Sequence, residues 1–441
     1  MARPALRRAL AVWMNGERVG TWTLPSNGPE TFTYSSDWLN SDSVRPISLS
    51  LPLGPPGTSF RGPVVTSFFD NLLPESNQVR TRIQTRFGAR SARPFDLLAE
   101  IGRDCVGAVQ LLPDGKPPGT VKKIEGTRLT DVGVERLLVA SLSAKPTFGG
   151  GEDDDFRISL AGMQEKTALL RHRNKWWRPS GATPSTHILK LPMGRVPQGI
   201  DLSTSVENEW LCGSILRAYG IEVASSAMDK FGDYRVLVVE RFDRRLASDR
   251  SWIVRLPQED LCQATGTPAV NKYQADSGPG ILAIMRLLLG STQPDVDRRN
   301  FFRAQLVFWL LCAIDGHAKN FSLFLDAGGA YRLTPLYDVL SAYPVLGKAR
   351  GKLSPNKVKM AMAVEGRRRH YGWQLMQRRH WEETARRCGL ANDFPALIAE
   401  LIEQTPEVAK QVSAAIPADF PDRVATPILN GIERASKTLR S

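Results

Sequence analysis

The sequence lacks the features that would place the protein in a membrane or send it out of the cell. The apolar run LVFWLLCAI at 306–314 is far shorter than the roughly 18 residues that a membrane-spanning helix needs. The first residues, MARPALRRALAVW, are basic but contain no apolar stretch long enough for a secretory signal. We therefore expect a cytoplasmic protein that does not interact with a membrane.

The sequence also has little cysteine and histidine, and neither residue type shows metal-ligand spacing. The five cysteines are scattered and odd in number, and none forms a CxxC pair, which excludes a disulfide framework and a zinc ribbon. The five histidines contain no HxxxH pattern. A zinc enzyme is therefore not expected.

Positive charge is in excess, with 58 Lys and Arg against 45 Asp and Glu, a formal net charge of +13. Such an excess favours an acidic partner, nucleic acid first. A solvated, arginine-rich surface without any partner explains the same number. Net charge alone does not decide between these two interpretations.

The order of hydrophobic patterns predicts an α+β protein of 441 residues with more than one core. Asn15-Gly16 between apolar runs predicts a β-hairpin, and alternating patterns recur up to about residue 245. Helical patterns dominate afterwards, so we expect a β-rich N-terminal half and an all-helical C-terminal half. The expected divisions are an α+β subdomain over 1–112, a linker or mobile segment over 113–155, a β-rich part over 156–245 and a helical part over 246–441.

The stretch DGHAKN at 315–320 carries the strongest chemical signal. Asp315 follows an apolar helix, and Asn320 begins a predicted hairpin, FSLFLDAGGAYRL, after which Asp338 ends a short apolar run. Protein kinases place a catalytic Asp and a metal-binding Asn with four residues between them, followed by a second metal-binding Asp. Mg²⁺ takes oxygen ligands, and a separate carboxylate accepts the hydroxyl proton. The pattern therefore indicates phosphoryl transfer.

A simpler interpretation of this stretch remains open at this point. Asp-Gly is a common turn at the end of a helix, and Asn is common where a strand begins. The spacing of Asp315 and Asn320 fits both interpretations, whereas Asp338 after the hairpin favours the catalytic one.

Three further features follow the order expected of a kinase. The turn SLAGMQEK at 159–166 offers backbone donors but lacks GxGxxG, Lys190 lies in the apolar strand HILKLP, and VVERFD at 238–243 is a candidate adenine hinge. Each has a structural alternative, such as a snorkelling edge-strand lysine or the end of a core strand. Their succession along the chain favours the kinase interpretation.

At these residues the sequence resembles the HipA family of bacterial serine/threonine protein kinase toxins. The resemblance covers essentially the whole chain and rests on these segments: FFDNLLPES, PFDLLAEIGRDCVGAVQLLP, DFRISLAGMQEKTALL, THILKLP, VERFDRR, RLPQEDLCQ, DGHAKNFS and YRLTPLYDVLSAYP. It implies a two-lobed protein-kinase-like fold that uses ATP and Mg²⁺.

The resemblance also implies roles for individual residues. Asp315 would be the catalytic base, and Asn320 and Asp338 would hold Mg²⁺. Autophosphorylation on Ser159 would eject the adjacent turn and silence the kinase, which agrees with the repulsion expected between two phosphates. The residues implied to line the ATP site are Ala161, Gly162, Met163, Gln164, Glu165, Lys166, Lys190, Glu240, Arg241, Phe242, His317, Ala318, Lys319, Asn320, Tyr337 and Asp338.

Two of these positions depart from common patterns. Met163 stands where the family usually has a smaller residue. Tyr337-Asp338 stands where other kinases carry Asp-Phe-Gly, a departure typical of the family.

The partners implied by the resemblance are a HipB-like helix-turn-helix antitoxin dimer, operator DNA and a protein substrate. The substrate would be a translation factor or an aminoacyl-tRNA synthetase, with glutamyl-tRNA synthetase the leading case, and its phosphorylation would inhibit growth and promote persistence. The basic segment 366–387 would contact operator phosphates, with Arg386 among the contacts. A solvated basic helix face is the alternative for this segment.

The sequence therefore predicts a toxin kinase of the non-specific serine/threonine type. One rival is a small-molecule kinase on the same scaffold, since fold does not determine substrate. The other is a DNA-binding corepressor with a vestigial site. The intact site residues argue against it: Asp315, Asn320, Asp338 and Lys190.

Overall fold

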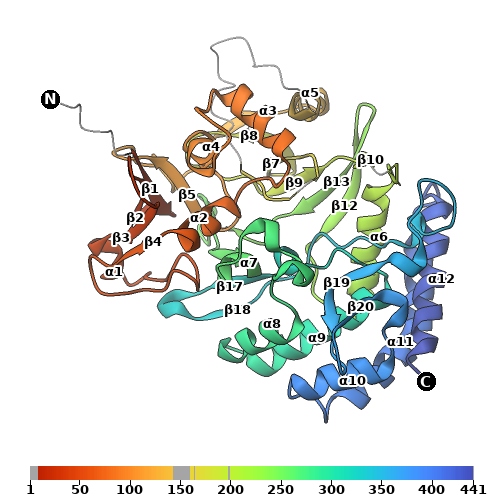
Figure 1. Cartoon of the computed structure of the whole chain (residues 1–441). Coiled ribbons are helices and arrows are strands. Elements are labelled where there is room, and N and C mark those ends of the chain that lie inside the picture. The colour runs from red at the N-terminus through yellow and green to blue at the C-terminus, as the bar shows by residue number, and fades with distance from the viewer. Residues whose placement is uncertain (1–7, 143–158, 163, 197–198, 441) are drawn as a thin grey trace.

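The computed structural model describes residues 8–142, 159–162, 164–196 and 199–440. In Figure 1 the N-terminal sheet and its helices lie on the left, a second sheet lies above the centre, and the C-terminal helices α11 and α12 lie on the right. None of the helices in the described ranges is long and apolar enough to cross a membrane.

The first sheet has five antiparallel strands in the order β4-β3-β2-β1-β5. Its hairpin turn is Asn15-Gly16, both with positive φ, as a two-residue turn requires, so the predicted hairpin is confirmed. Trp22 stacks on Phe69 with ring centroids 3.9 Å apart and anchors the sheet against the helices. The elements are β1 (Arg8–Met14), β2 (Glu17–Leu24), β3 (Thr31–Tyr34), β4 (Ser59–Arg61), β5 (Val109–Pro113), α1 (Ser36–Leu39), α2 (Pro63–Asp70), α3 (Asn77–Phe87) and α4 (Pro94–Ile101).

The second sheet has six strands in the order β12-β13-β9-β7-β8-β6, and each neighbouring pair is antiparallel. Alternation along β13 sends Val236 and Val238 to the face covered by α5, and Leu237 and Val239 to the face covered by α6. The elements are β6 (Gly126–Arg128), β7 (Lys166–His172), β8 (Lys175–Pro179), β9 (His187–Lys190), β12 (Ser226–Phe231), β13 (Tyr234–Glu240), α5 (Asp131–Leu142) and α6 (Ser205–Ala218).

The linker expected over 113–155 differs from the structure over residues 126–142. Residues 126–128 form β6, which pairs with β8, and the following helix α5 buries Val134 and Leu138 against the sheet. A three-residue strand leaves almost no alternating pattern, and the surrounding Pro and Gly dominated the composition. Residues 143–155 lie outside the described residues.

The C-terminal half is mainly helical and forms one large core, but it is not all-helical as expected. A three-stranded sheet, β16-β17-β18, contains the predicted hairpin with its tip at Ala327–Gly329. These strands are too short to outweigh the helical pattern in the sequence. The helices are α7 (Leu261–Ala264), α8 (Ile281–Leu287), α9 (Pro294–Leu310), α10 (Arg378–Arg387), α11 (Phe394–Ala415) and α12 (Asp422–Thr438). The strands are β16 (Gln258–Asp260), β17 (Ser322–Leu325), β18 (Tyr331–Leu333), β19 (Lys359–Val364) and β20 (His370–Gly372).

Short elements complete the connections. The two-stranded ribbons are β10 (Gly194–Arg195) with β11 (Asp201–Leu202), and β14 (Arg244–Leu246) with β15 (Ile253–Arg255). Short 3₁₀ helices are η2 (Ala269–Asn271), η3 (Gln274–Asp276), η4 (Leu288–Gly290), η5 (Ala318–Asn320), η6 (Ala327–Gly329), η7 (Tyr343–Val345), η8 (Pro355–Lys357) and η9 (Trp373–Leu375).

A buried ionic cluster joins the first sheet region to the second. Asp104 lies after α4 and accepts a hydrogen bond of 2.9 Å from Arg244 Nη2, while Arg241 Nη2 donates to Asp243 Oδ2 at 2.8 Å. Burial alone would raise the pKa of Asp104, but Arg244, Arg241 and Arg255 hold it below its ordinary value. Buried charges are tolerated only when they are paired with good geometry. The cluster therefore fixes how the N-terminal subdomain sits on the rest of the chain.

Candidate functional site

The loop between α9 and β17 has a backbone that only certain residues allow. Helix α9 ends at Leu310, four residues earlier than the sequence suggested, and Cys312 adopts a φ of 48°. A Cβ at Gly316 would lie 2.4 Å from the Phe308 ring, so this position requires glycine. The 3₁₀ helix Ala318–Asn320 then leads directly into β17.

Lys190, at the end of β9, joins three elements of the site. Its Nζ lies 2.6 Å from Glu209 Oε1 on α6 and 2.7 Å from Asp338 Oδ1. Burial alone would lower the pKa of Lys190, but the two carboxylates raise it above its ordinary value. Burial would likewise raise the pKa of Asp338, yet Lys190 and Lys166 hold it below its ordinary value. Both groups are therefore charged.

Sequence reasoning missed Glu209. Kinases pair the strand lysine with a glutamate on the following helix. The available signal was the helix SVENEWLCGSILRA, which follows the lysine strand after the short β10–β11 ribbon and carries Glu207 and Glu209 in its first two turns. Glu209 is 7% exposed.

Asn320 and Asp338 lie together in a way that suits a hard cation. Asn320 Nδ2 donates to the Asp338 carbonyl at 3.1 Å, whereas its buried Oδ1 has no hydrogen-bond partner within the described residues. A buried carbonyl oxygen rarely stays unpaired. The described residues contain no cluster of three or more His, Cys, Asp or Glu that could hold a metal. Mg²⁺ fits here through one amide, one carboxylate and phosphate oxygens.

Asp315 lies at the mouth of the site, with 58% of its side chain exposed. It accepts a hydrogen bond from the Tyr273 hydroxyl, and His317 Nε2 lies 3.8 Å away. The surrounding protein reduces its solvation and raises the pKa of Asp315, while Tyr273 and Lys272 act in the opposite direction. Burial lowers the pKa of His317 to about 3, so its imidazole is neutral at pH 7.

The turn that precedes β7 is held in place by its own bonds. Gly162 has a φ of 102°, and Lys166 Nζ donates to the Ala161 carbonyl at 2.7 Å. Burial lowers the pKa of Lys166 to about 8. Ser159 is fully buried, and its hydroxyl donates to the Leu72 carbonyl at 2.7 Å. Met163 lies outside the described residues.

The predicted hinge presents an aromatic side chain and a limited set of backbone donors. The N–H groups of Glu240 and Arg241 already donate to the carbonyls of Ser225 and Thr186, at 2.8 and 2.9 Å. The Arg241 side chain belongs to the buried ionic cluster. The Phe242 ring packs against Tyr337, with ring centroids 5.8 Å apart.

Lys319 holds the loop in place. Its Nζ donates to the Asn71 carbonyl at 3.1 Å, to Asn71 Oδ1 at 2.8 Å and to Asp260 Oδ2 at 2.6 Å. An ammonium has three donors, and all three are used. Tyr337 adds a bond from its hydroxyl to the Lys319 carbonyl, at 2.8 Å.

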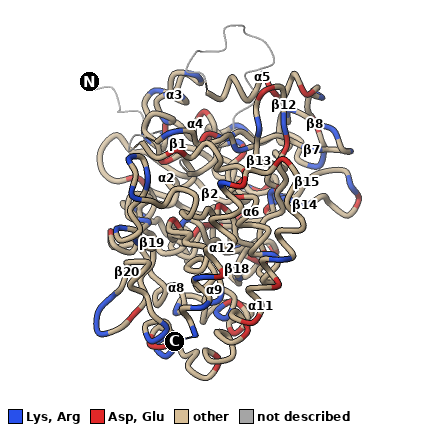
Figure 2. Tube along the Cα trace, turned by 90° about the vertical axis from the view of Figure 1, so that its right-hand side faces the viewer, with Lys and Arg blue, Asp and Glu red and all other residues tan. Residues whose placement is uncertain are grey.

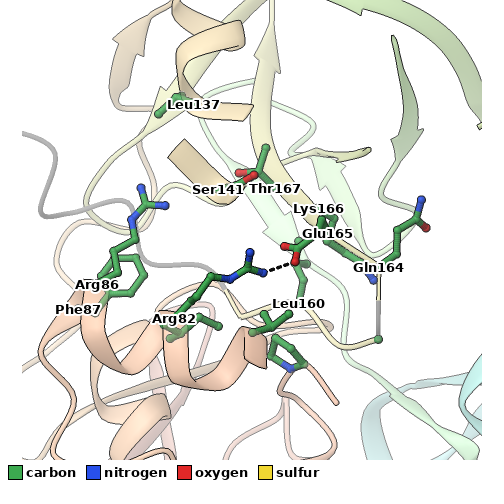
Figure 3. Close-up of a pocket in the computed structure, with 14 residues that line it drawn as sticks. Arg82, Arg86, Phe87, Leu137, Ser141, Leu160, Gln164, Glu165, Lys166 and Thr167 are labelled. Atoms are coloured by element: carbon green, nitrogen blue, oxygen red, sulfur yellow. Dashed lines mark hydrogen bonds and ion pairs between the residues drawn. The ribbon is translucent and has the colours of Figure 1, made fainter. Parts of the chain in front are cut away.

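Most of the predicted residues line one cleft, whose empty volume is ≈ 1290 Å³ with the open mouth included. The residues brought together are Ala161, Gly162, Gln164, Lys166, Lys190, Glu240, Arg241, Phe242, Asp315, His317, Lys319, Asn320, Tyr337 and Asp338. Ala318 is fully buried, and Arg386 lies apart on α10. Glu165 points into a neighbouring cavity, where Figure 3 shows it paired with Arg82 of α3.

Comparison with known proteins shows which family this chain resembles. The family model of the HipA N-terminal domain matches residues 10–112, and that of the HipA-like C-terminal domain matches residues 158–412. The chain is 34% identical over 414 residues to "Putative kinase Y4mE" of Sinorhizobium fredii, covering 92% of both proteins. It is 28% identical over 321 residues to "Serine/threonine-protein kinase toxin HipA" of Shewanella oneidensis, covering 70% of this chain and 69% of that protein.

The fold agrees with the sequence comparisons. A solved complex of Shewanella oneidensis HipA, HipB and operator DNA matches with a TM-score of 0.77 at 22% identity, over 98% of this chain and 97% of the matched chain. The predicted two-lobed, kinase-like α+β fold is therefore confirmed. The matching domains at both ends of the chain and the relative at 34% identity show that this chain belongs to the HipA family.

Proposed function

We propose that this chain is a serine/threonine protein kinase of the toxin type. The observation that carries the proposal is the arrangement around Lys190, which bridges Glu209 and Asp338. Asn320 lines the same cleft, and its buried Oδ1 has no hydrogen-bond partner among the described residues. This arrangement contains the parts that phosphoryl transfer needs. The names of two relatives, a HipA toxin kinase and a kinase-named homologue, support the same conclusion.

The cleft residues divide the work of holding Mg-ATP. Asn320 and Asp338 would hold Mg²⁺, and the third donor of Lys190 is available for a phosphate oxygen. Phe242 and Tyr337 would pack against the adenine. When bound, Mg-ATP supplies the phosphoryl group with its charge partly neutralised. Lys319 would position the loop instead of contacting phosphate, because its donors are already used.

Asp315 would accept the proton of the attacking hydroxyl. Its exposed carboxylate lies at the mouth of the cleft, where a serine or threonine on another protein can reach it. The Tyr273 hydroxyl donates to one of its oxygens and opposes the rise in the pKa of Asp315 that burial causes. His317 is neutral, so it adds no positive charge beside the Asp315 carboxylate.

Ser159 is proposed as the autophosphorylation site. Its hydroxyl is buried and bonded to the Leu72 carbonyl, so the described conformation has no room for a phosphate group. A phosphate added there would break this bond and repel the phosphates of ATP. The turn would then have to leave the cleft, which would stop the kinase.

The proposed partners are a HipB-like antitoxin dimer, operator DNA and a protein substrate, foremost an aminoacyl-tRNA synthetase. The matched Shewanella oneidensis complex contains HipB and operator DNA, which supports the first two. Figure 2 shows a positively charged loop beside β20, where Arg367, Arg368 and Arg369 follow one another. Arg386 on α10 pairs with Glu383 at 2.7 Å, and it would exchange this partner for a DNA phosphate.

The domain division is part of the proposal. Residues 1–112 would make up the N-terminal subdomain, 156–245 the β-rich nucleotide-binding part of the kinase core and 246–441 its mainly helical C-terminal lobe.

Asp315→Asn is expected to abolish transfer of labelled phosphate from ATP to protein in a lysate. Loss of a general base costs about 10²–10⁴-fold in rate. Asp326→Asn, at the exposed tip of the β17–β18 hairpin, is the matched control and should retain full activity. Activity of Asp315→Asn within about tenfold of the wild type, or label on a metabolite instead of a protein, would contradict the proposal.

Tyr273→Phe should move the acidic limb of the pH–kcat/KM profile to higher pH. The lost hydrogen bond favours the ionised Asp315, so its removal raises the pKa of that carboxyl, and the base is protonated at a higher pH. The shift should be small, since water restores part of the lost bond. Tyr371→Phe on β20 serves as the control. A limb that shifts to lower pH would count against this role.

Ser159→Ala should remove autophosphorylation, because alanine has no hydroxyl to accept the phosphoryl group. Phosphopeptide mapping after incubation with ATP and Mg²⁺ measures it, with Asp315→Asn as the inactive control. Transfer to other proteins should persist in Ser159→Ala. Phosphate at unchanged stoichiometry in Ser159→Ala would refute the assignment.

A further inference from the structure

We infer that residues 71–82 of the N-terminal subdomain form a positioning segment for phosphoryl transfer, because this one segment contacts the nucleotide turn, the catalytic loop and the side of the catalytic base. The inference rests on the proposed kinase function and extends it to a domain with no assigned part in it. The segment consists of the end of the turn after α2 and the first half of α3.

The backbone of the segment holds the nucleotide turn. The Leu72 carbonyl accepts the Ser159 hydroxyl at 2.7 Å. Two residues further on, Pro74 forms a parallel β-bridge with Gly162, and the Glu75 N–H donates to the Gly162 carbonyl at 3.3 Å. The turn is therefore held at Ser159 and Gly162 by backbone from another subdomain.

A side chain of α3 holds the far end of the same turn. Arg82 forms an ion pair with Glu165, and Figure 3 shows the two side chains meeting across the cavity between α3 and β7. Arg82 also donates to the Leu142 carbonyl at 3.2 Å, and Arg86, one helical turn further along, donates to the Ala140 carbonyl at 3.0 Å. Both arginines therefore contact the end of α5, but of the two Arg82 also pairs with Glu165, which offers a matched pair for an experiment.

The Glu75 carboxylate connects the segment to the side of the catalytic base. It lies 2.6 Å from Lys272 Nζ, and the two side chains are only 14% and 8% exposed. The Lys272 carbonyl accepts the Ala318 N–H at 3.3 Å, and the next residue, Tyr273, bonds to Asp315. Glu75 therefore holds the nucleotide turn with its N–H and the base side with its carboxylate.

Asn71 completes the segment by holding the catalytic loop. It is 1% exposed and accepts two bonds from Lys319, one on its backbone oxygen and one on its side chain. Its own amide donates to the Ser67 and Thr267 carbonyls at 2.8 and 3.0 Å, which fixes its orientation. The residues that make these holding contacts, Asn71, Leu72 and Glu75, therefore lie close together on one short stretch of backbone.

This geometry makes the positions of the nucleotide turn and the catalytic loop depend on each other. Because the residues that hold them share a short backbone, a shift of the nucleotide turn strains the contacts of Lys272 and Lys319. Catalytic groups must be held within a fraction of an ångström by such supporting contacts. The N-terminal subdomain is therefore part of the catalytic machinery through Asn71 and Glu75, although neither needs to touch the reacting atoms.

Glu75→Gln in the full chain tests the segment, with Glu17→Gln on the exposed start of β2 as control. Hydrogen–deuterium exchange should rise about tenfold or more in 159–166 and around 272–273, the effect expected when a hydrogen bond to a charged group is lost. The rest of the N-terminal subdomain should exchange as in the wild type. For the kinase reaction, kcat should fall about tenfold or more and the KM for ATP should rise.

Arg82→Ala against Arg86→Ala gives a second comparison that does not remove a buried charge pair. Faster exchange in 159–166 for Arg82→Ala only is the expected result. Equal effects of the two arginine variants, or uniform exchange across the N-terminal subdomain in Glu75→Gln, would overturn the inference. If the wild type transfers no phosphate to protein, the proposed function fails, and the exchange of 159–166 still decides whether the segment holds the turn.

Discussion

The site depends on one buried cation, Lys190, shared between two carboxylates. Neither Glu209 nor Lys190 could be buried alone, because an unpaired charge in a protein interior is costly. The pair fixes helix α6 against strand β9, and the second bond draws Asp338 toward the same ammonium. This shared contact connects the second sheet to the C-terminal half across the cleft. The positions of Asn320 and Asp315 relative to the nucleotide turn follow from it.

The N-terminal subdomain completes the cleft from outside the kinase core. The cluster of Asp104, Asp243 and three arginines fixes its place, and its segment 71–82 contacts the nucleotide turn and the catalytic loop. Ser159 lies between these two contacts, since its N–H bonds to the Asp104 carbonyl and its hydroxyl to Leu72. Phosphorylation of this serine would therefore affect both the ATP site and the contact between subdomains.

The sequence predicted the features whose signal is local. Asp315 and Asn320 lie on one loop with fixed spacing, and the Asn15-Gly16 turn specifies its own hairpin. It did not predict Tyr273 or the segment 71–82, because their contacts join residues far apart in the chain, such as Asn71 and Lys319. Glu209 lies only 19 residues from Lys190, and its position in the helix after the lysine strand was a signal that was missed. The predicted linker was wrong over 126–142, where the short strand β6 pairs with the distant strand β8. Lys319 lines the cleft, but its role in holding the loop could not be predicted, because its donors go to Asn71 and Asp260.

The most direct test of the account is calorimetric titration of ATP into the full chain, in excess Mg²⁺ and in excess EDTA. If Asn320 and Asp338 hold the metal beside the phosphates, removing Mg²⁺ should weaken ATP binding about tenfold or more. Asp338→Asn should abolish most of that difference between the two conditions. Equal ATP affinity with and without Mg²⁺ in the wild type, or a full Mg²⁺ effect in Asp338→Asn, would contradict the account.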